Sequence, residues 1–161
     1  MNAFEVAISE VLRLEGGYID DPRDAGGRTR WGISQRSYPH IDVAALTRDA
    51  AIEIYRRDYW MPLRGDELPP ALALVVFDCA VNMGRVRASK LLQETLGVGT
   101  DGVIGPQTLA AAARAPLPWA VTDFLARRAY AYGSITDFVI FGRGWMKRVL
   151  EIHAAALALV P

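Results

Sequence analysis

One segment of the chain is apolar on nearly every side, and it limits the folds that are open to this protein. Residues 71–83 read ALALVVFDCAVNM, with Pro69-Pro70 before them and Gly84 after them. Proline is favoured in the first turn of a helix, and glycine is favoured just beyond the last turn. A helix that is apolar almost all round must be buried on all sides. The sequence therefore predicts a central helix that other helices surround.

The rest of the chain supplies those helices and one short β element. Apolar residues recur at helical spacing, and proline or glycine marks the ends of the segments. The segment around 28–33 instead alternates in the manner of a strand after several turn-forming residues. We therefore expect an α+β fold that is predominantly helical, with a small N-terminal β-hairpin. The further helices are expected at about 4–15, 47–60, 87–96, 106–114, 118–132 and 145–159.

Composition excludes several classes of protein. The 161 residues include 18 basic and 18 acidic side chains, so the basic excess of a nucleic-acid-binding protein is lacking. A single cysteine, Cys79, rules out an internal disulfide framework. The apolar run 154–160 is far shorter than the ~20 residues of a membrane span. We predict one compact domain, 1–161, that is made in the cytoplasm without a signal peptide and does not insert stably into a membrane.

The candidate chemistry begins at Glu15, at the end of the first helical segment. Glu15 lies about two helical turns after Ile8, so it projects from the apolar face, and Gly16-Gly17 then ends the helix. Loss of water and the negative end of the helix dipole both favour a protonated carboxyl group there. A protonated carboxyl group is what general acid catalysis near neutral pH requires. The alternative is a helix-end carboxylate that simply reaches solvent.

The loop after Glu15 offers two partners. Turn-forming residues precede an extended piece in which Thr29, Trp31 and Ile33 are expected on one side. A hairpin folded over the helix end would bring Asp24 and Thr29 close to Glu15. One acid together with a carboxylate and a hydroxyl group that hold a water suits the cleavage of a glycosidic bond. The alternatives are a turn role for Asp24 and a plain strand role for Thr29.

At these residues the chain resembles a known family. Glu15-Gly16-Gly17-Tyr18 and the run from Asp24 to Ile33 resemble the signature of glycoside hydrolase family 108, N-acetylmuramidases of phage and prophage endolysins and related bacterial proteins. Asp24 has the spacing from Glu15 that is usual in phage-type lysozymes, whereas Thr29 comes one residue early. Residues 92–109 are similar to the peptidoglycan-binding-like region of the family. Further similar segments are Tyr59-Trp60, residues 65–69, residues 77–84 and Gly144-Trp145.

The resemblance implies a lysozyme-like fold with a catalytic part, 1–96, and a helical peptidoglycan-binding-like part, 97–161. It implies hydrolysis of the β-1,4 bond between N-acetylmuramic acid and N-acetylglucosamine, with no metal and no cofactor. Glu15 would be the general acid, and Asp24, helped by Thr29, would position water; we favour inversion of the anomeric centre. The residues expected to bind substrate are Tyr18, Trp31 and Asn82.

Partners and rival functions follow from the same analysis. The expected partner is the glycan strand of peptidoglycan, acted on in the cell wall or periplasm by a monomer that a holin or a secretion route releases. A non-catalytic peptidoglycan-binding module is one alternative. A cysteine amidase or endopeptidase that uses Cys79 with His40 or His153 is another, although Cys79 lies in the most apolar segment. Asp78 and Asn82 share a helix face, either as an internal hydrogen-bond network or, for Asn82, as a contact to the glycan.

Overall fold

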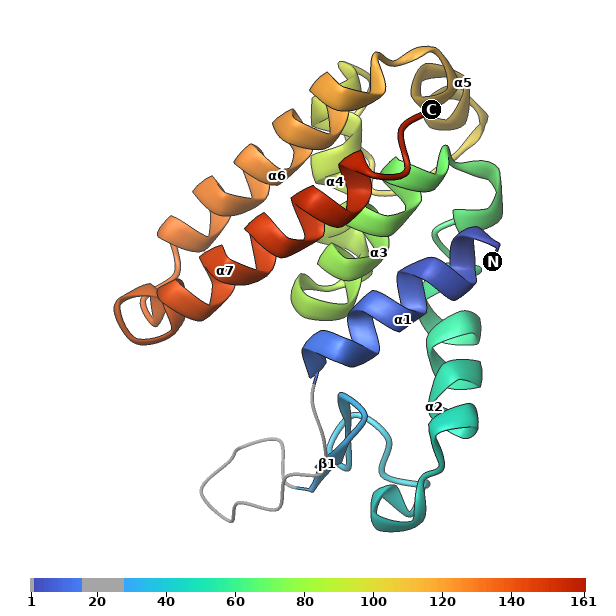
Figure 1. The fold of residues 1–161 in the computed structure, drawn as a ribbon, viewed down its shortest axis with the longest axis vertical. Coiled ribbons are helices and arrows are strands. Elements are labelled where there is room, and N and C mark those ends of the chain that lie inside the picture. The colour runs from blue at the N-terminus through green and yellow to red at the C-terminus, as the bar shows by residue number, and fades with distance from the viewer. Residues whose placement is uncertain (1, 16–27) are drawn as a thin grey trace.

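The fold is described from a computed structural model that covers residues 2–15 and 28–161. Within these residues it contains seven α-helices and one two-stranded antiparallel sheet, so the predicted α+β class is confirmed (Figure 1). The elements are α1 (Ala3–Glu15), β1 (Thr29–Arg30), β2 (Ile33–Ser34), η1 (Val43–Ala45), α2 (Arg48–Tyr55), η2 (Arg56–Trp60), η3 (Gly65–Glu67), α3 (Pro70–Met83), α4 (Arg85–Leu96), α5 (Pro106–Arg114), α6 (Leu117–Gly133) and α7 (Phe138–Leu157).

Helix α3 is the centre of the fold, as its apolar sequence predicts. All ten residues from Ala71 to Ala80 are buried. The helix begins with Pro70 and ends at Gly84, whose φ of 90° an L side chain rarely adopts. Helices α1, α4, α6 and α7 pack around α3, and Figure 1 shows α3 between α7 and α1. The hydrophobic core of the protein is therefore centred on α3.

Helix α1 places Glu15 at the edge of that core. Its buried residues recur at the helical spacing that the sequence shows; they are Phe4, Ala7, Ile8, Val11 and Leu12. The ring of Phe4 packs at an angle against Trp60 and Phe77. The helix is fixed at its N-terminus by a reciprocal pair of hydrogen bonds between Asn2 and Glu5, each side chain accepting from the other's backbone N–H at 2.9 Å. Because these contacts hold α1 against the core, its last residue, Glu15, has a defined position.

The predicted small N-terminal β-hairpin is confirmed, but its turn lies inside the segment that was expected to be one extended piece. Strands β1 and β2 pair with Thr29 opposite Ser34 and Arg30 opposite Ile33, so Trp31 and Gly32 form the turn. Both turn residues have positive φ, 55° for Trp31 and 77° for Gly32, which is the backbone of a type I′ turn. The prediction that Thr29, Trp31 and Ile33 lie on one side of one strand is therefore wrong.

The predicted helix over 47–60 changes its winding part-way. Thr47 caps it, as its Oγ1 accepts from the backbone N–H of Ala50 at 3.2 Å. The α-helix ends at Tyr55 and continues as one π-helical turn, η2. Tyr55 and Trp60 are both buried, which confirms that these aromatic residues pack in the core.

The helices of the C-terminal half follow the predicted order, but one of them, α7, begins earlier in the sequence than predicted. Helix α5 has the predicted bounds, but α7 begins at Phe138 rather than near Trp145 because its first two turns tolerate Gly142 and Gly144. The turn between α4 and α5 is held by the buried Gln93, which hydrogen-bonds Asp101, Val103, Thr108 and the N–H of Gly102. Shaping a turn is thus the role of this Asp-Gly segment, and the division of the chain at residue 97 stays a prediction.

Candidate active site

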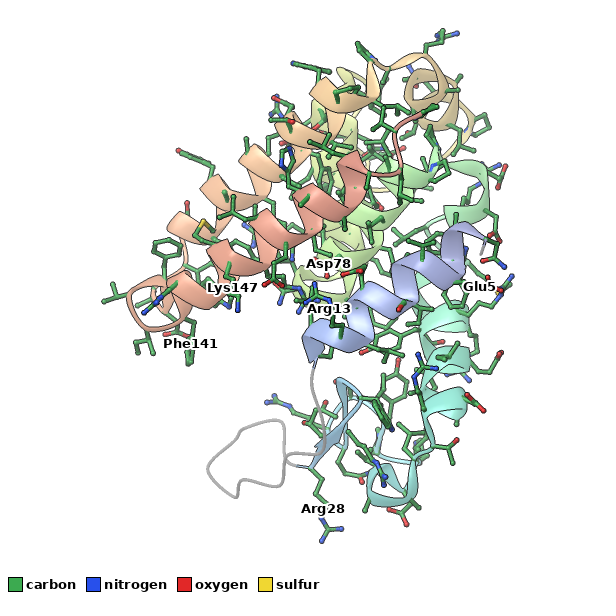
Figure 2. The ribbon with its side chains drawn as sticks, viewed as in Figure 1. Glu5, Arg13, Arg28, Asp78, Phe141 and Lys147 are labelled. Atoms are coloured by element: carbon green, nitrogen blue, oxygen red, sulfur yellow. The ribbon has the colours of Figure 1, made fainter. Side chains whose placement is uncertain are left out.

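The candidate site is built around Glu15, the last residue of α1. Its side chain is only 20% exposed, so it does not extend into bulk solvent. Its Oε1 lies 2.7 Å from Nη1 of Arg148, which comes from the middle of α7. The ion pair joins two helices that are far apart in sequence, and Figure 2 shows Arg13 and Asp78 in the region between α1 and α7.

Arg148 is shared between Glu15 and a buried carboxylate. It donates from Nε and Nη2 to Oδ1 of Asp78 at 3.0 and 2.7 Å, and Arg128 donates to Oδ2 of Asp78 at 2.6 Å. The Asp78 side chain is fully buried, and that of Arg148 is 12% exposed. Burial alone would lower the pKa of Arg148, but the carboxylates of Asp78 and Glu15 outweigh it and raise that pKa. Arg148 therefore stays a cation.

The same network reaches the end of α3. Arg128 donates to the hydroxyl oxygen of Tyr132, which in turn donates to Oδ1 of Asn82. Asp78 and Asn82 thus share one network, with Asp78 as its buried centre and Asn82 at its exposed end. This confirms the interpretation of Asp78 as an internal hydrogen-bond partner, and it leaves the amide nitrogen of Asn82 able to donate to a ligand.

The hairpin turn packs directly on Glu15. A Cβ atom on Gly32 would lie 2.8 Å from Cγ of Glu15 and would also collide with the hydroxyl group of Tyr55. The Tyr55 hydroxyl donates to the carbonyl oxygen of Trp31 at 2.9 Å. Burial and the nearby charge of Glu15 raise the pKa of Tyr55, so this hydroxyl keeps its proton. The turn is therefore held against the carboxyl group by a contact that only glycine permits.

A groove opens beside this network. It has a volume of about 380 Å³ and lies between the ends of α1 and α3 and one face of α7. Arg148 lines it and also pairs with Glu15, so this one side chain connects the groove to the carboxyl group. Its lining residues are Leu14, Asn82, Gly144, Trp145, Lys147, Arg148 and Glu151.

The structure places four of the six predicted site residues. Glu15 and Asn82 lie at opposite ends of the charge network, and Trp31 forms the turn against Glu15. Thr29 lies in β1, one residue before Arg30 leads into that turn. Asp24 and Tyr18 lie outside the described residues, so the expected separation of the Glu15 and Asp24 carboxyl groups stays a prediction.

Sequence reasoning missed Arg148 and the contact with Tyr55. A signal for Arg148 was available, since it lies at helical spacing between Trp145 and Ile152 on the face of α7 that packs on α3. A cation at such a position needs a buried counter-ion. The identity of that counter-ion could not be read from spacing, because Glu15 and Asp78 are distant in the chain.

Groups outside this site offer little rival chemistry. Burial raises the pKa of the Cys79 thiol to about 11, so it is a poor nucleophile near neutral pH. His153 contacts Thr122 at 3.0 Å, and no hydrogen bond joins a histidine to Cys79 among residues 2–15 and 28–161. The same residues contain no cluster of histidine, cysteine, aspartate or glutamate suited to a metal ion. None of their helices is long and apolar enough to cross a bilayer.

Comparison with known proteins decides the family. Residues 8–84, which include Glu15, the hairpin and α3, match the family Glycosyl hydrolase 108. The structure of Brucella abortus SagA superposes with a TM-score of 0.89 at 36% sequence identity, over 97% of this chain and 94% of that one. The chain belongs to glycosyl hydrolase family 108. A comparison with curated protein sequences gave no significant match.

Membership of this family fixes the broad activity. The glycosyl hydrolase 108 chain is a glycoside hydrolase of lysozyme type, with peptidoglycan as its substrate. The predicted lysozyme-like fold is confirmed by the similarity to SagA. The matched segment ends at Gly84, directly after the helix that carries Asp78 and Asn82.

Proposed function

We propose that this glycosyl hydrolase 108 protein cleaves the β-1,4 bond between N-acetylmuramic acid and N-acetylglucosamine, with Glu15 as the general acid. The observation that carries the proposal is the position of Glu15. It lies at the end of a helix whose apolar face is buried, packed against the Gly32 turn, and its partner Arg148 lines a groove of about 380 Å³. A fixed, partly buried carboxyl group beside a groove has the placement that proton transfer to a bound leaving group requires.

Arg148 connects the proposed acid to a second carboxylate. Its Nη1 lies 2.7 Å from Oε1 of Glu15, so the acid has a cationic neighbour where the sequence predicted only an apolar setting. Arg148 also donates three hydrogen bonds to Asp78. The cation beside Glu15 is therefore held in place by a buried partner of its own.

The remaining roles rest on the family resemblance. Protonation of the glycosidic oxygen by Glu15 would accompany an oxocarbenium-like transition state, while Asp24 and Thr29 would hold the attacking water. Inversion requires the two carboxyl groups to be about 6.5–9.5 Å apart, and retention requires about 5–5.5 Å. Tyr18, Trp31 and Asn82 would bind the glycan. Action as a monomer, release by a holin or a secretion route, and an endolysin role in phage lysis belong to the same proposal.

The test is Glu15→Gln, which keeps the shape of the side chain and removes the transferable proton. Loss of the acid should lower the rate of peptidoglycan cleavage on the order of 10²–10⁴-fold while the protein stays folded. Glu10→Gln is the matched control, since Glu10 is on the same helix and pairs with Arg13 at its surface.

The products identify the bond. Mass spectrometry of digested sacculi should show muramic acid at the new reducing ends. Glucosamine ends would indicate a glucosaminidase, and anhydro ends a lytic transglycosylase. Full activity in Glu15→Gln would contradict the proposed acid, and sedimentation with sacculi without any release of reducing sugar would favour a binding module instead.

A further inference from the structure

Helix α7 contains two glycines, and packing explains only one of them. A Cβ atom on Gly142 would lie 2.8 to 2.9 Å from the ring of Phe138, which folds back over it. Among the residues that the structure describes, a Cβ atom on Gly144 would meet nothing within 4 Å. Glycine in the interior of a helix is less favourable than alanine, since it loses more backbone freedom on folding. The fold therefore has no evident use for the missing side chain at position 144.

The open space beside Gly144 is the groove next to Glu15. Gly144 and Trp145 line it from α7, Asn82 lines it from the end of α3, and Arg148 joins it to the carboxyl group. A glycine on the wall of a groove lets a ligand approach the helix backbone closely. An unfavourable residue that the packing does not require is thus found where a bound molecule would benefit from it.

The residues that line the groove indicate the chemical class of the ligand. Trp145 is held in place by stacking on Tyr132, with ring centroids 4.9 Å apart and planes at 23°, so it presents a rigid edge with both apolar and polar character. The Oδ1 atom of Asn82 is already occupied by Tyr132, which leaves its amide nitrogen as a fixed donor for a hydroxyl or acetamido oxygen. Lys147, whose side chain is 76% exposed, lies at the rim and pairs at 3.6 Å with Glu151, which also lines the groove.

We propose that this groove is a subsite for one N-acetylated sugar ring of the glycan strand, and that Gly144 determines whether the ring fits. The inference rests on the proposed function, because it assigns a subsite to the same glycan. The sugar ring lies against the backbone at Gly144, beside Trp145, with Asn82 donating to it.

Gly144→Ala is the decisive variant, because it should raise the stability of the helix and lower the activity of the enzyme. Helix propensity should raise the Tm by roughly 2–4 °C. The added methyl group should lower kcat/KM on purified sacculi at least tenfold, with the loss mainly in KM. Gly133→Ala is the matched control, as Gly133 is also a helical glycine whose Cβ atom would meet nothing within 4 Å, and it does not line the groove. That control should gain stability and keep wild-type kinetics.

Binding measurements separate this proposal from the proposed function. In the Glu15→Gln background, Gly144→Leu should reduce the fraction of protein that sediments with purified sacculi at least fivefold, and Gly133→Leu should not. If the wild type releases no reducing sugar but this difference in sedimentation holds, the catalytic proposal fails and the subsite stands. Kinetics of Gly144→Ala within twofold of the wild type, or unchanged sedimentation of Gly144→Leu, would overturn the subsite.

Discussion

Arg148→Met removes the centre of the charge network while keeping an unbranched apolar side chain in α7. Asp78 would keep the hydrogen bond from Arg128 to Oδ2, but its Oδ1 would lose both described donors, which come from Arg148 alone. Because the Asp78 side chain is fully buried, water cannot replace those donors. Removing one partner of a buried ion pair costs about 3–5 kcal/mol of unfolding free energy.

The two carboxylate partners of Arg148, Asp78 and Glu15, should contribute unequally to that cost. Glu15 is 20% exposed and can be hydrated when its partner is lost, so Glu15→Gln should change the unfolding free energy by about 1 kcal/mol or less. At ~2–4 °C per kcal/mol for a chain of this length, Arg148→Met should lower the Tm by about 6–20 °C. Urea unfolding followed by far-UV circular dichroism measures both variants on one scale.

A double-mutant cycle tests the physical reason. In the Asp78→Asn background, Arg148→Met no longer leaves a buried carboxylate short of donors, so it should cost at least ~1 kcal/mol less than in the wild type. Additive costs within ~0.5 kcal/mol, or an Arg148→Met variant as stable as Glu15→Gln, would refute the view that Asp78 and Arg148 form a coupled buried pair.

Two further variants probe the neighbouring contacts. Gly32→Ala should cost about 1–3 kcal/mol, since φ is positive there and the new Cβ atom meets Glu15 and Tyr55, and it should also lower lytic activity; wild-type values in a turbidity assay and in urea unfolding would show that the turn need not touch Glu15. The Cys79 thiol, with its pKa raised to about 11 by burial, should have a thiolate fraction on the order of 10⁻³ at pH 8, so a thiol reagent should modify it only after unfolding. Rapid labelling of the folded protein, or loss of lysis in Cys79→Ala, would revive the amidase alternative.

Most helices could be predicted from the sequence pattern within each segment. The apolar run of α3 and the five buried positions of α1 follow from periodicity, and Pro106 marks the first residue of α5. The start of α7 was missed because Gly142 and Gly144 lower helix propensity. Within the helix, the ring of Phe138 folds back over Gly142, a contact that the propensity of single residues does not indicate.

The candidate site could be predicted only in part, because its geometry is non-local. Glu15 was found from its position at the end of an apolar helix face. The turn at Trp31 was not, because tryptophan with positive φ is unfavourable and type I′ turns favour asparagine and glycine. The hydrogen bond from Tyr55 to the Trp31 carbonyl helps hold that backbone. Such a tertiary contact leaves no trace in the spacing of residues.

The two glycines that border Glu15 and its groove carry different information. At Gly32 the fold leaves no room, so packing alone accounts for the residue, and a substitution there should harm stability and activity together. At Gly144 the fold leaves room and does not fill it, so stability and activity should separate. Gly133 shares the open surroundings but does not line the groove, so only at Gly144 should a gain in stability accompany a loss of activity. If the two effects separate in this way, α7 contributes to the proposed substrate groove as well as supplying Arg148 to Glu15.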